Sequence, residues 1–210
     1  MTPPWLSRPL SSQLAIVGLL ALPACAAPPE SGATPETATP SAAATVPVAT
    51  PVAASGGTPV DAAGLSIHLP TGWQPETPSS GMRAAQATIA GSAGPGQLAV
   101  FYFGPGGGGG LDANIDRWIS QMELASGAST ERQTFAAGAL QVTAIDLSGT
   151  LKASTIGSFP NTDQPGYRML AAVVEGSGGP WFLRAVGPEA TMAEQREAFF
   201  AMLRGAGAGG

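Results

Sequence analysis

The sequence predicts one α+β domain, an α/β/α-type sandwich with a mainly antiparallel sheet of about seven strands and two main helices. Short apolar stretches, separated by glycine- and proline-rich turns, are typical of strands joined by hairpins. Two other stretches repeat apolar residues at helical period. The expected order is three strands, a helix, four strands and a helix, and strands joined by short local turns pair antiparallel.

Composition narrows the classes of function. The chain has 210 residues, of which 11% are charged, and its net charge is −5. No cluster of basic residues is present, so we expect no nucleic-acid partner. One cysteine and one histidine exclude a disulfide framework and a Cys/His metal cluster within a single chain. We therefore predict no metal and no cofactor.

The N-terminal 24 residues are predicted to be a signal peptide, because Arg8 precedes an apolar run at 14–22 that is too short to span a bilayer. The run leads into Leu22-Pro-Ala-Cys25, which resembles the lipobox of bacterial lipoproteins. This resemblance implies an acyl chain such as palmitate on Cys25, and an exported protein anchored to a membrane and facing the periplasm or the cell exterior. Ordinary secretion is the alternative, since Ala24-Cys25-Ala26 also has the form of a general cleavage site.

Residues 25–60 are predicted to form a disordered linker. Alanine, proline, threonine, serine, valine and glycine make up almost all of this stretch, which has too little apolar surface to offset the entropy of ordering. We expect the globular domain to occupy residues 61–206 and residues 207–210 to form a frayed tail.

The first half of the domain contains three predicted strands. Residues 65–69 alternate between apolar and polar, which places His68 on the solvent side, where we expect no catalytic role. Residues 82–90 form the second strand. Residues 96–103 are apolar on both phases of the alternation, which is typical of a central strand covered on both faces.

A glycine-rich loop follows and leads into the first predicted helix, residues 111–126. The loop contains a G-x-G-x-x-G match, but Leu111 and Asp112 stand where a phosphate-binding Walker loop needs lysine and serine or threonine. We expect a flexible connection instead. The helix has one apolar stripe that includes Trp118, which we place in the core.

The second half supplies four more strands, a long loop and the last helix. The loop at 149–166 exceeds the usual length of a connection, and such loops are commonly functional or disordered. Thr191 and Glu194 have the spacing of a helix capping box. Phe199 and Phe200 are expected on the core side of that helix. The strands are predicted at residues 131–135, 140–148, 167–175 and 181–186.

Three sequence blocks resemble an uncharacterised bacterial family whose arrangement is similar to the PsbP-like α/β/α sandwich. These blocks are Asn114, Arg117 and Trp118 on the first helix, the strand at 167–175, and Gly187-Pro188 with the phenylalanine-rich helix after it. The resemblance covers about residues 64–204 and implies an accessory or binding module.

We predict a non-catalytic module that binds an envelope protein or a small ligand, since no nucleophile, base or metal constellation is evident. The long loop combines apolar, charged and amide groups, and an aromatic–arginine pair stands where its chain returns to the sheet. The predicted ligand-binding residues are Lys152, Phe159, Asn161, Tyr167 and Arg168. The alternative is a carboxylate-dependent hydrolase of the cell envelope that uses Asp146, Asp163 or Glu175.

Overall fold

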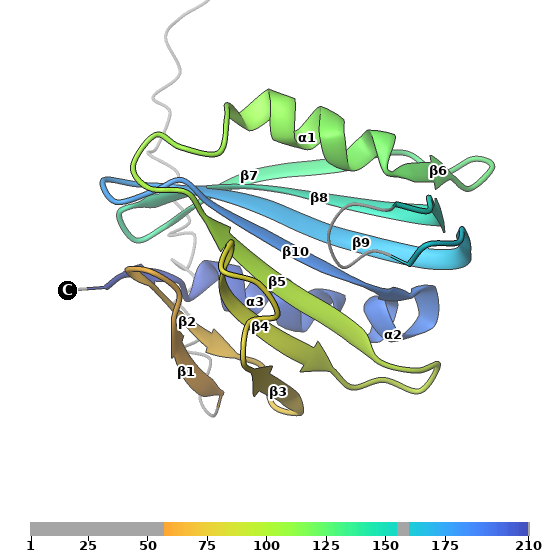
Figure 1. Ribbon diagram of the computed structural model, residues 1–210, viewed down its shortest axis with the longest axis horizontal. Coiled ribbons are helices and arrows are strands. Elements are labelled where there is room, and N and C mark those ends of the chain that lie inside the picture. Colours follow the sequence, from red (N-terminus) through yellow and green to blue (C-terminus); the bar gives the residue numbers. More distant parts are fainter. Residues whose placement is uncertain (1–56, 155–159, 210) are drawn as a thin grey trace, which may run out of the picture. The chain divides into compact units, whose positions relative to one another are not determined.

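The computed structural model describes residues 57–154 and 160–209. These residues belong to one compact unit that runs from Ala49 to Gly210. The predicted signal peptide, the predicted lipidation site Cys25, most of the predicted linker and Phe159 lie outside the described residues. The described part combines a few helices with a mostly antiparallel sheet, which confirms the α+β prediction (Figure 1).

The main sheet has eight strands, each antiparallel to its neighbours. Its order is β3-β4-β5-β10-β9-β8-β6, and β7 pairs with β8 beside β6. A second sheet has the order β1-β2-β11. The strands are β1 (Thr58–Asp61), β2 (Leu65–Leu69), β3 (Trp73–Glu76), β4 (Arg83–Ile89), β5 (Gly96–Tyr102), β6 (Met122–Leu124), β7 (Glu131–Ala137), β8 (Leu140–Leu151), β9 (Gln164–Glu175), β10 (Trp181–Pro188) and β11 (Gly207–Ala208).

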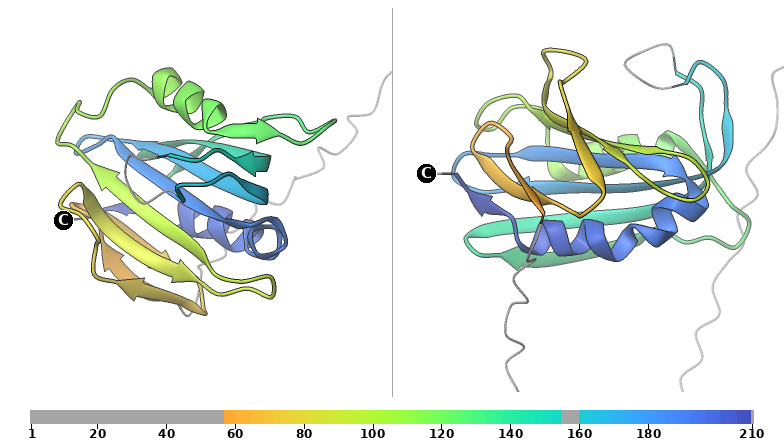
Figure 2. Two further views of the ribbon diagram at one scale, coloured as in Figure 1. Left: turned by 45° about the vertical axis from the view of Figure 1, so that its right-hand side comes forward. Right: turned by 90° about the horizontal axis from the view of Figure 1, so that it is seen from below.

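The helices lie on opposite faces of the main sheet. Helix α1 (Leu111–Ser120) covers one face, whereas α2 (Glu189–Glu194), α3 (Arg196–Arg204) and the small sheet cover the other (Figure 2). Each face has its own apolar core. Trp118 packs on the α1 side against Ile145, Leu147 and neighbouring side chains, while Phe199 and Phe200 are buried on the α2–α3 side. The prediction that Trp118 is a core residue is confirmed.

The first helix is shorter than the sequence predicted. It ends at Ser120, and Met122–Leu124 forms strand β6, which pairs with Gly149–Leu151 of β8. Met122 fits the apolar stripe of a longer helix and also the inward phase of a strand. The free edge of β8 therefore determines the conformation of this segment.

The predicted capping box is wrong. The last helical region begins at Glu189, directly after Pro188, and a short break at Gln195 divides it into α2 and α3. The Thr191 hydroxyl donates to the Gly94 carbonyl at 2.7 Å, and Glu194 accepts from the Ser92 side chain. Long-range hydrogen bonds to the β4–β5 hairpin thus replace the local bonds that the motif predicted.

The ends of the domain and the long loop also differ from the prediction. Strand β1 begins before the predicted domain start at 61, and Gly207–Ala208 pairs with β2 where a frayed tail was expected. Strands β8 and β9 extend to Leu151 and from Gln164, so the connection between them covers only residues 152–163. Gly149 lies at a break in the register, where a Cβ would come within 2.0 Å of the Glu123 carbonyl oxygen.

Candidate functional site

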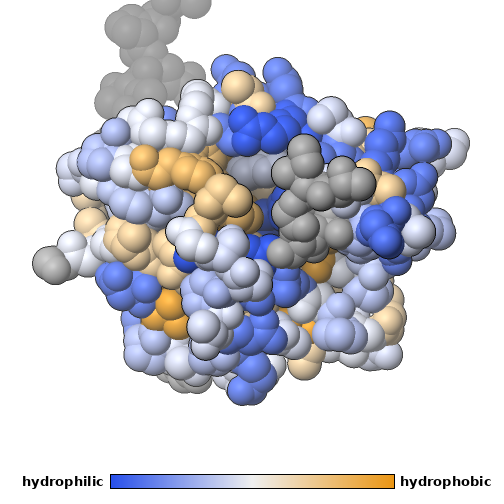
Figure 3. Space-filling model, viewed as in Figure 1, coloured by the Kyte–Doolittle hydropathy of each residue, from blue (hydrophilic) through white to orange (hydrophobic). Residues whose placement is uncertain are grey.

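Helix α1 covers only part of its face of the sheet. It packs over β8 and β9 and leaves the floor formed by β4, β5 and β10 open beside it. Two cavities that share Arg184 lie there, of about 430 Å³ and about 290 Å³, and together we call them the open-face cleft. Figure 3 shows this face, hollowed near its centre.

The larger cavity is lined by Ser79, Ser80, Met82, Arg83, Phe101, Phe103, Asn114, Arg117, Trp118, Gln121, Phe182 and Arg184. The smaller one is lined by Thr88, Pro95, Gly96, Gln97, Ala99, Leu151, Pro160, Tyr167, Arg184, Val186 and Gly187. The larger cavity is thus both aromatic and cationic, and the smaller one mixes small apolar residues with polar ones.

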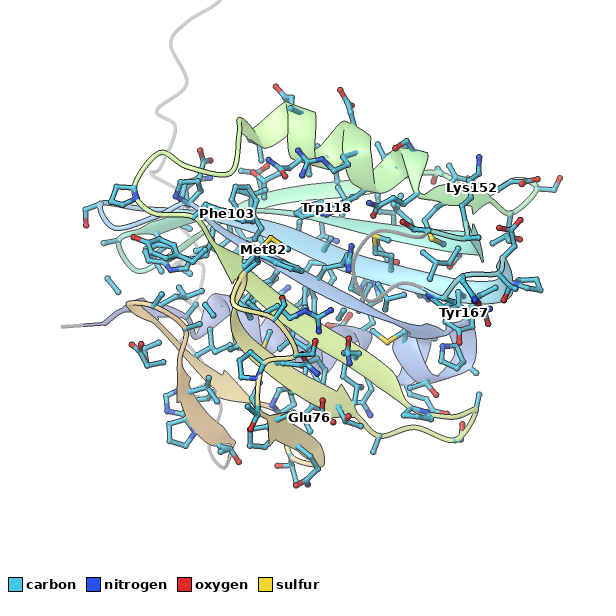
Figure 4. The ribbon with its side chains drawn as sticks, viewed as in Figure 1. Glu76, Met82, Phe103, Trp118, Lys152 and Tyr167 are labelled. Carbon is cyan, nitrogen blue, oxygen red and sulfur yellow. The ribbon has the colours of Figure 1, made fainter. Side chains whose placement is uncertain are left out.

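An aromatic wall forms one side of the larger cavity. The rings of Phe101 and Phe103 are stacked with their centroids 6.5 Å apart, and Phe103 lies 6.1 Å from the ring of Phe182. Met82 and Phe103 remain 57% and 48% exposed at its rim (Figure 4). They are the only large hydrophobic side chains that are exposed in the described part of the chain. Exposed apolar groups gathered beside a cavity indicate a place of contact with a ligand or partner.

Two arginines lie against this wall. The guanidinium carbons of Arg83 and Arg184 are 5.8 Å and 5.7 Å from the centroid of the Phe101 ring. In the sheet register Arg83 faces Phe101, and Arg184 lies between Ala99 on β5 and Ala171 on β9. The two alanine methyl groups are small, so they leave room for the long Arg184 side chain to lie along the sheet.

A hydrogen-bond network holds Arg83 in place. Its Nη1 donates to Gln86 Oε1 at 2.5 Å and to Gln97 Oε1 at 3.0 Å. Gln86 in turn donates through Nε2 to Glu76 at 2.8 Å, and the Thr88 hydroxyl also donates to Glu76. These two bonds of Arg83 use a single nitrogen of a group that carries five N–H donors. The arginine is therefore fixed in orientation while part of its donor capacity faces other partners.

Burial changes the proton affinity of both arginines. Burial lowers the pKa of Arg83, and burial together with repulsion from Arg83 lowers the pKa of Arg184 to about 10. A pKa near 10 leaves the Arg184 guanidinium charged at neutral pH. The larger cavity therefore carries two close positive charges, and the exposed Arg117 adds a third at its edge.

Gln121 contributes an unsatisfied polar group to the same cavity. Its Oε1 atom is buried and has no hydrogen-bond partner within residues 57–154 and 160–209. A buried acceptor without a partner costs about 1–3 kcal/mol. Because this oxygen is itself buried, it is a local cost at the end of α1 and does not show a contact with a ligand in the cavity.

The ligand-binding residues predicted from sequence do not gather at one place. Tyr167 lines the smaller cavity, but Arg168 points to the opposite face of β9, as successive strand residues do. There its Nε and Nη2 donate to Asp146 at 2.7 Å and 2.6 Å. Lys152 and Asn161 are exposed and line neither cavity (Figure 4). Of the four predicted residues that the structure describes, only Tyr167 lines the cleft.

The three carboxylates of the hydrolase alternative lie apart. Asp146 is buried and is bonded by Arg168 and Arg196. Glu175 pairs with Gln141 of β8, and Gln141 lies five positions from Asp146 on the same strand. At the ~3.3 Å rise of a strand, Glu175 is therefore about 17 Å from Asp146 along the sheet. Asp163 accepts from the Ala153 amide at the other end of the same strands. His68 is exposed on β2, as the alternation predicted.

The glycine loop is a packed connection between β5 and α1. Gly108 has a φ of +82°, and a Cβ there would come within 2.4 Å of the Phe182 ring. Asn114 Nδ2 donates to the carbonyls of Gly108 at 3.1 Å and of Gly110 at 3.0 Å. The loop therefore packs against the aromatic wall at Gly107 and Gly108, and the glycines at 104, 106 and 109 have positive φ.

Sequence reasoning missed the main residues of the cleft. The available signal was a charged residue inside an apolar strand: Arg184 interrupts the stretch from Trp181 to Val186, and Arg83 opens a strand of small residues. Such a residue is costly unless it pairs or serves a function. The pairing of β4, β5 and β10, which brings both arginines to Phe101, could not be read from the local pattern.

Within the residues that the structure describes, no group of histidine, cysteine, aspartate or glutamate side chains is arranged to hold a metal ion. None of the helices in that part of the chain is long and apolar enough to cross a membrane. A scan against protein-family models and a search of curated proteins each found no match.

Proposed function

We propose that this protein is a non-catalytic module that binds a small ligand in the open-face cleft. The observation that carries the proposal is the pair of arginines held against Phe101 in an open cavity of about 430 Å³. That volume falls within the ~300–1,000 Å³ typical of small-molecule sites. Two like charges close together repel each other, and a ligand of opposite charge offsets this repulsion.

The polar groups of the cleft support binding over chemistry. They are guanidinium, amide and hydroxyl groups, which fix a ligand by donating and accepting hydrogen bonds. The separation of Asp146, Asp163 and Glu175 counts against the close carboxylate pair that the hydrolase alternative requires. The helices on both faces of the sheet agree with the further proposal of a PsbP-like sandwich, a class that the sequence resemblance associates with accessory and binding modules.

We further propose that the module is exported and held at a membrane by an acyl group on Cys25. Replacing Cys25 with alanine is then expected to release the protein from the membrane fraction and to block maturation of the N-terminus. Cell fractionation followed by mass spectrometry of the N-terminus measures both effects. A variant that stays membrane-bound with unchanged processing would contradict the anchor and leave the cleft unaffected.

Binding in the cleft can be tested with a neutral apolar fluorophore, 1-aminoanthracene, which brightens when it leaves water. We expect saturable binding to the full-length protein with one site per chain. Met82→Ser and Phe103→Ser each remove an apolar contact at the rim, so each is expected to weaken binding by about tenfold or more, since full burial of such side chains is worth about 1.5–3 kcal/mol.

Val60→Ser is the matched control, since Val60 is a partly buried apolar residue of the small sheet. It should leave fluorophore binding unchanged. Absence of saturable binding, or equal weakening by all three substitutions, would contradict the proposed function.

A further inference from the structure

We infer that the ligand of the open-face cleft is a small single-chain amphiphile with an anionic head, either a carboxylate or a phosphate monoester. The head binds between Arg83 and Arg184. The apolar body lies along Phe101, Phe103 and Met82. This inference rests on the proposed function and adds the chemistry of the ligand. It follows from the charge, the apolar wall and the size of the cavity.

The charge of the cavity is opposite to that of the chain. The whole chain has a net charge of −5, yet three arginines line the larger cavity, and no carboxylate belongs to the described residues of its lining. The larger cavity is therefore richer in positive charge than the chain as a whole.

The donors are suited to an oxyanion. A guanidinium is a planar fork that matches the oxygen spacing of carboxylates and phosphates. Arg83 is only 7% exposed and is oriented through Gln86 and Gln97. A preorganised, partly desolvated pair of guanidinium groups binds an anion with little loss of side-chain entropy.

The apolar body is indicated by what lies next to the arginines. Phe101 touches both guanidinium groups and stacks on Phe103, which with Met82 stays about half exposed. An alkyl or aryl chain attached to the head would cover these surfaces. The smaller cavity meets the larger one at Arg184, which leaves room for a head bulkier than a carboxylate.

The test compares three probes by isothermal titration calorimetry: octanoate, its neutral analogue octanamide, and inorganic phosphate. The full-length protein carries Cys25→Ala, so that no attached acyl group competes. We expect octanoate to bind at least about tenfold more tightly than octanamide, which corresponds to one charge-assisted hydrogen bond. Inorganic phosphate, which has the charge without the apolar body, should bind more weakly than octanoate.

Arg184→Met is expected to remove the preference for octanoate and to keep the binding of octanamide. The melting temperature of the variant shows whether it folds. Arg83→Gln provides the same test if Arg184→Met does not fold. Arg204→Gln is the control, since Arg204 lies over Phe135 and Phe200 on the other face and should leave the preference intact.

Equal affinity for octanoate and octanamide would overturn the inference, as would a preference that survives both cleft substitutions. In either case binding of 1-aminoanthracene would show that the proposed function still stands. Loss of that binding as well would contradict the proposed function itself. A last measurement mixes the protein with vesicles of phosphatidylcholine that contain 20% phosphatidylglycerol. If the protein sediments with these vesicles, loses this property in Arg184→Met and does not bind octanoate, a free amphiphile is not the ligand.

Discussion

Replacing Trp118 with alanine is expected to lower the free energy of unfolding by about 3–5 kcal/mol, the usual cost of removing a large buried aromatic side chain. Trp118 is 5% exposed and is the side chain through which α1 packs on Ile145, Leu147 and the strands beneath. No other aromatic residue of α1 can fill the space that it would leave. Chemical denaturation of the full-length protein measures the change.

Ser120→Ala is the control for effects of substitution on the helix itself, because Ser120 is exposed on the same helix. Its effect should stay within about 0.5 kcal/mol, as for most surface substitutions. A loss below about 1 kcal/mol for Trp118→Ala would mean that α1 does not depend on this contact. The helix that bounds the cleft would then be held by other residues.

Replacing Asp146 with asparagine is expected to cost about 3 kcal/mol. The Asp146 side chain is 4% exposed and accepts hydrogen bonds from Arg168 and Arg196 at 2.6–2.8 Å. The hydrogen bonds to Asp146 raise the pKa of both arginines, so the pair is favoured in its charged form. The asparagine amide lacks the negative charge of Asp146. The guanidinium groups of Arg168 and Arg196 would then lie close together in a largely buried place without that charge between them.

Asp112→Asn is the matched control, because Asp112 pairs with Arg132 at 3.1 Å but the two side chains are 77% and 44% exposed. Exposed ion pairs contribute about 0–1 kcal/mol, so this change should be nearly silent. Equal and small losses for both substitutions in urea denaturation would contradict a structural role of the Asp146 cluster.

The sequence predicted well those elements whose apolar pattern fits only one type of secondary structure. The strand at β5 is apolar on both phases and does lie inside the sheet, between β4 and β10, although part of one of its faces borders the cleft. Trp118 stands on a clear helical stripe and is buried. The prediction of a helix after Ser120 was wrong because Met122 fits both the helical and the strand periodicity. Only the pairing with strand β8 distinguishes the two.

The site was predicted less well because it depends on pairing between distant strands. The sequence assigned Tyr167 and Arg168 to one ligand, but strand alternation puts the two side chains on opposite faces, and only Tyr167 lines the smaller cavity. Arg83 and Arg184 are separated by about a hundred residues and meet only through β5. Neither of them belongs to a motif, so the local sequence could not assign their common role.

The most direct test of the open-face cleft as the binding site is the indole N–H spectrum of the protein, recorded by NMR during titration with 1-aminoanthracene. Trp118 lines the larger cavity. The indoles of Trp73 and Trp181 donate to Gln195 and to the Ala63 carbonyl in the other core. We predict that the Trp118 signal shifts in proportion to occupancy and that the signals of Trp73 and Trp181 stay in place. Saturable binding that moves Trp73 or Trp181 and leaves Trp118 unchanged would contradict the assignment of the site.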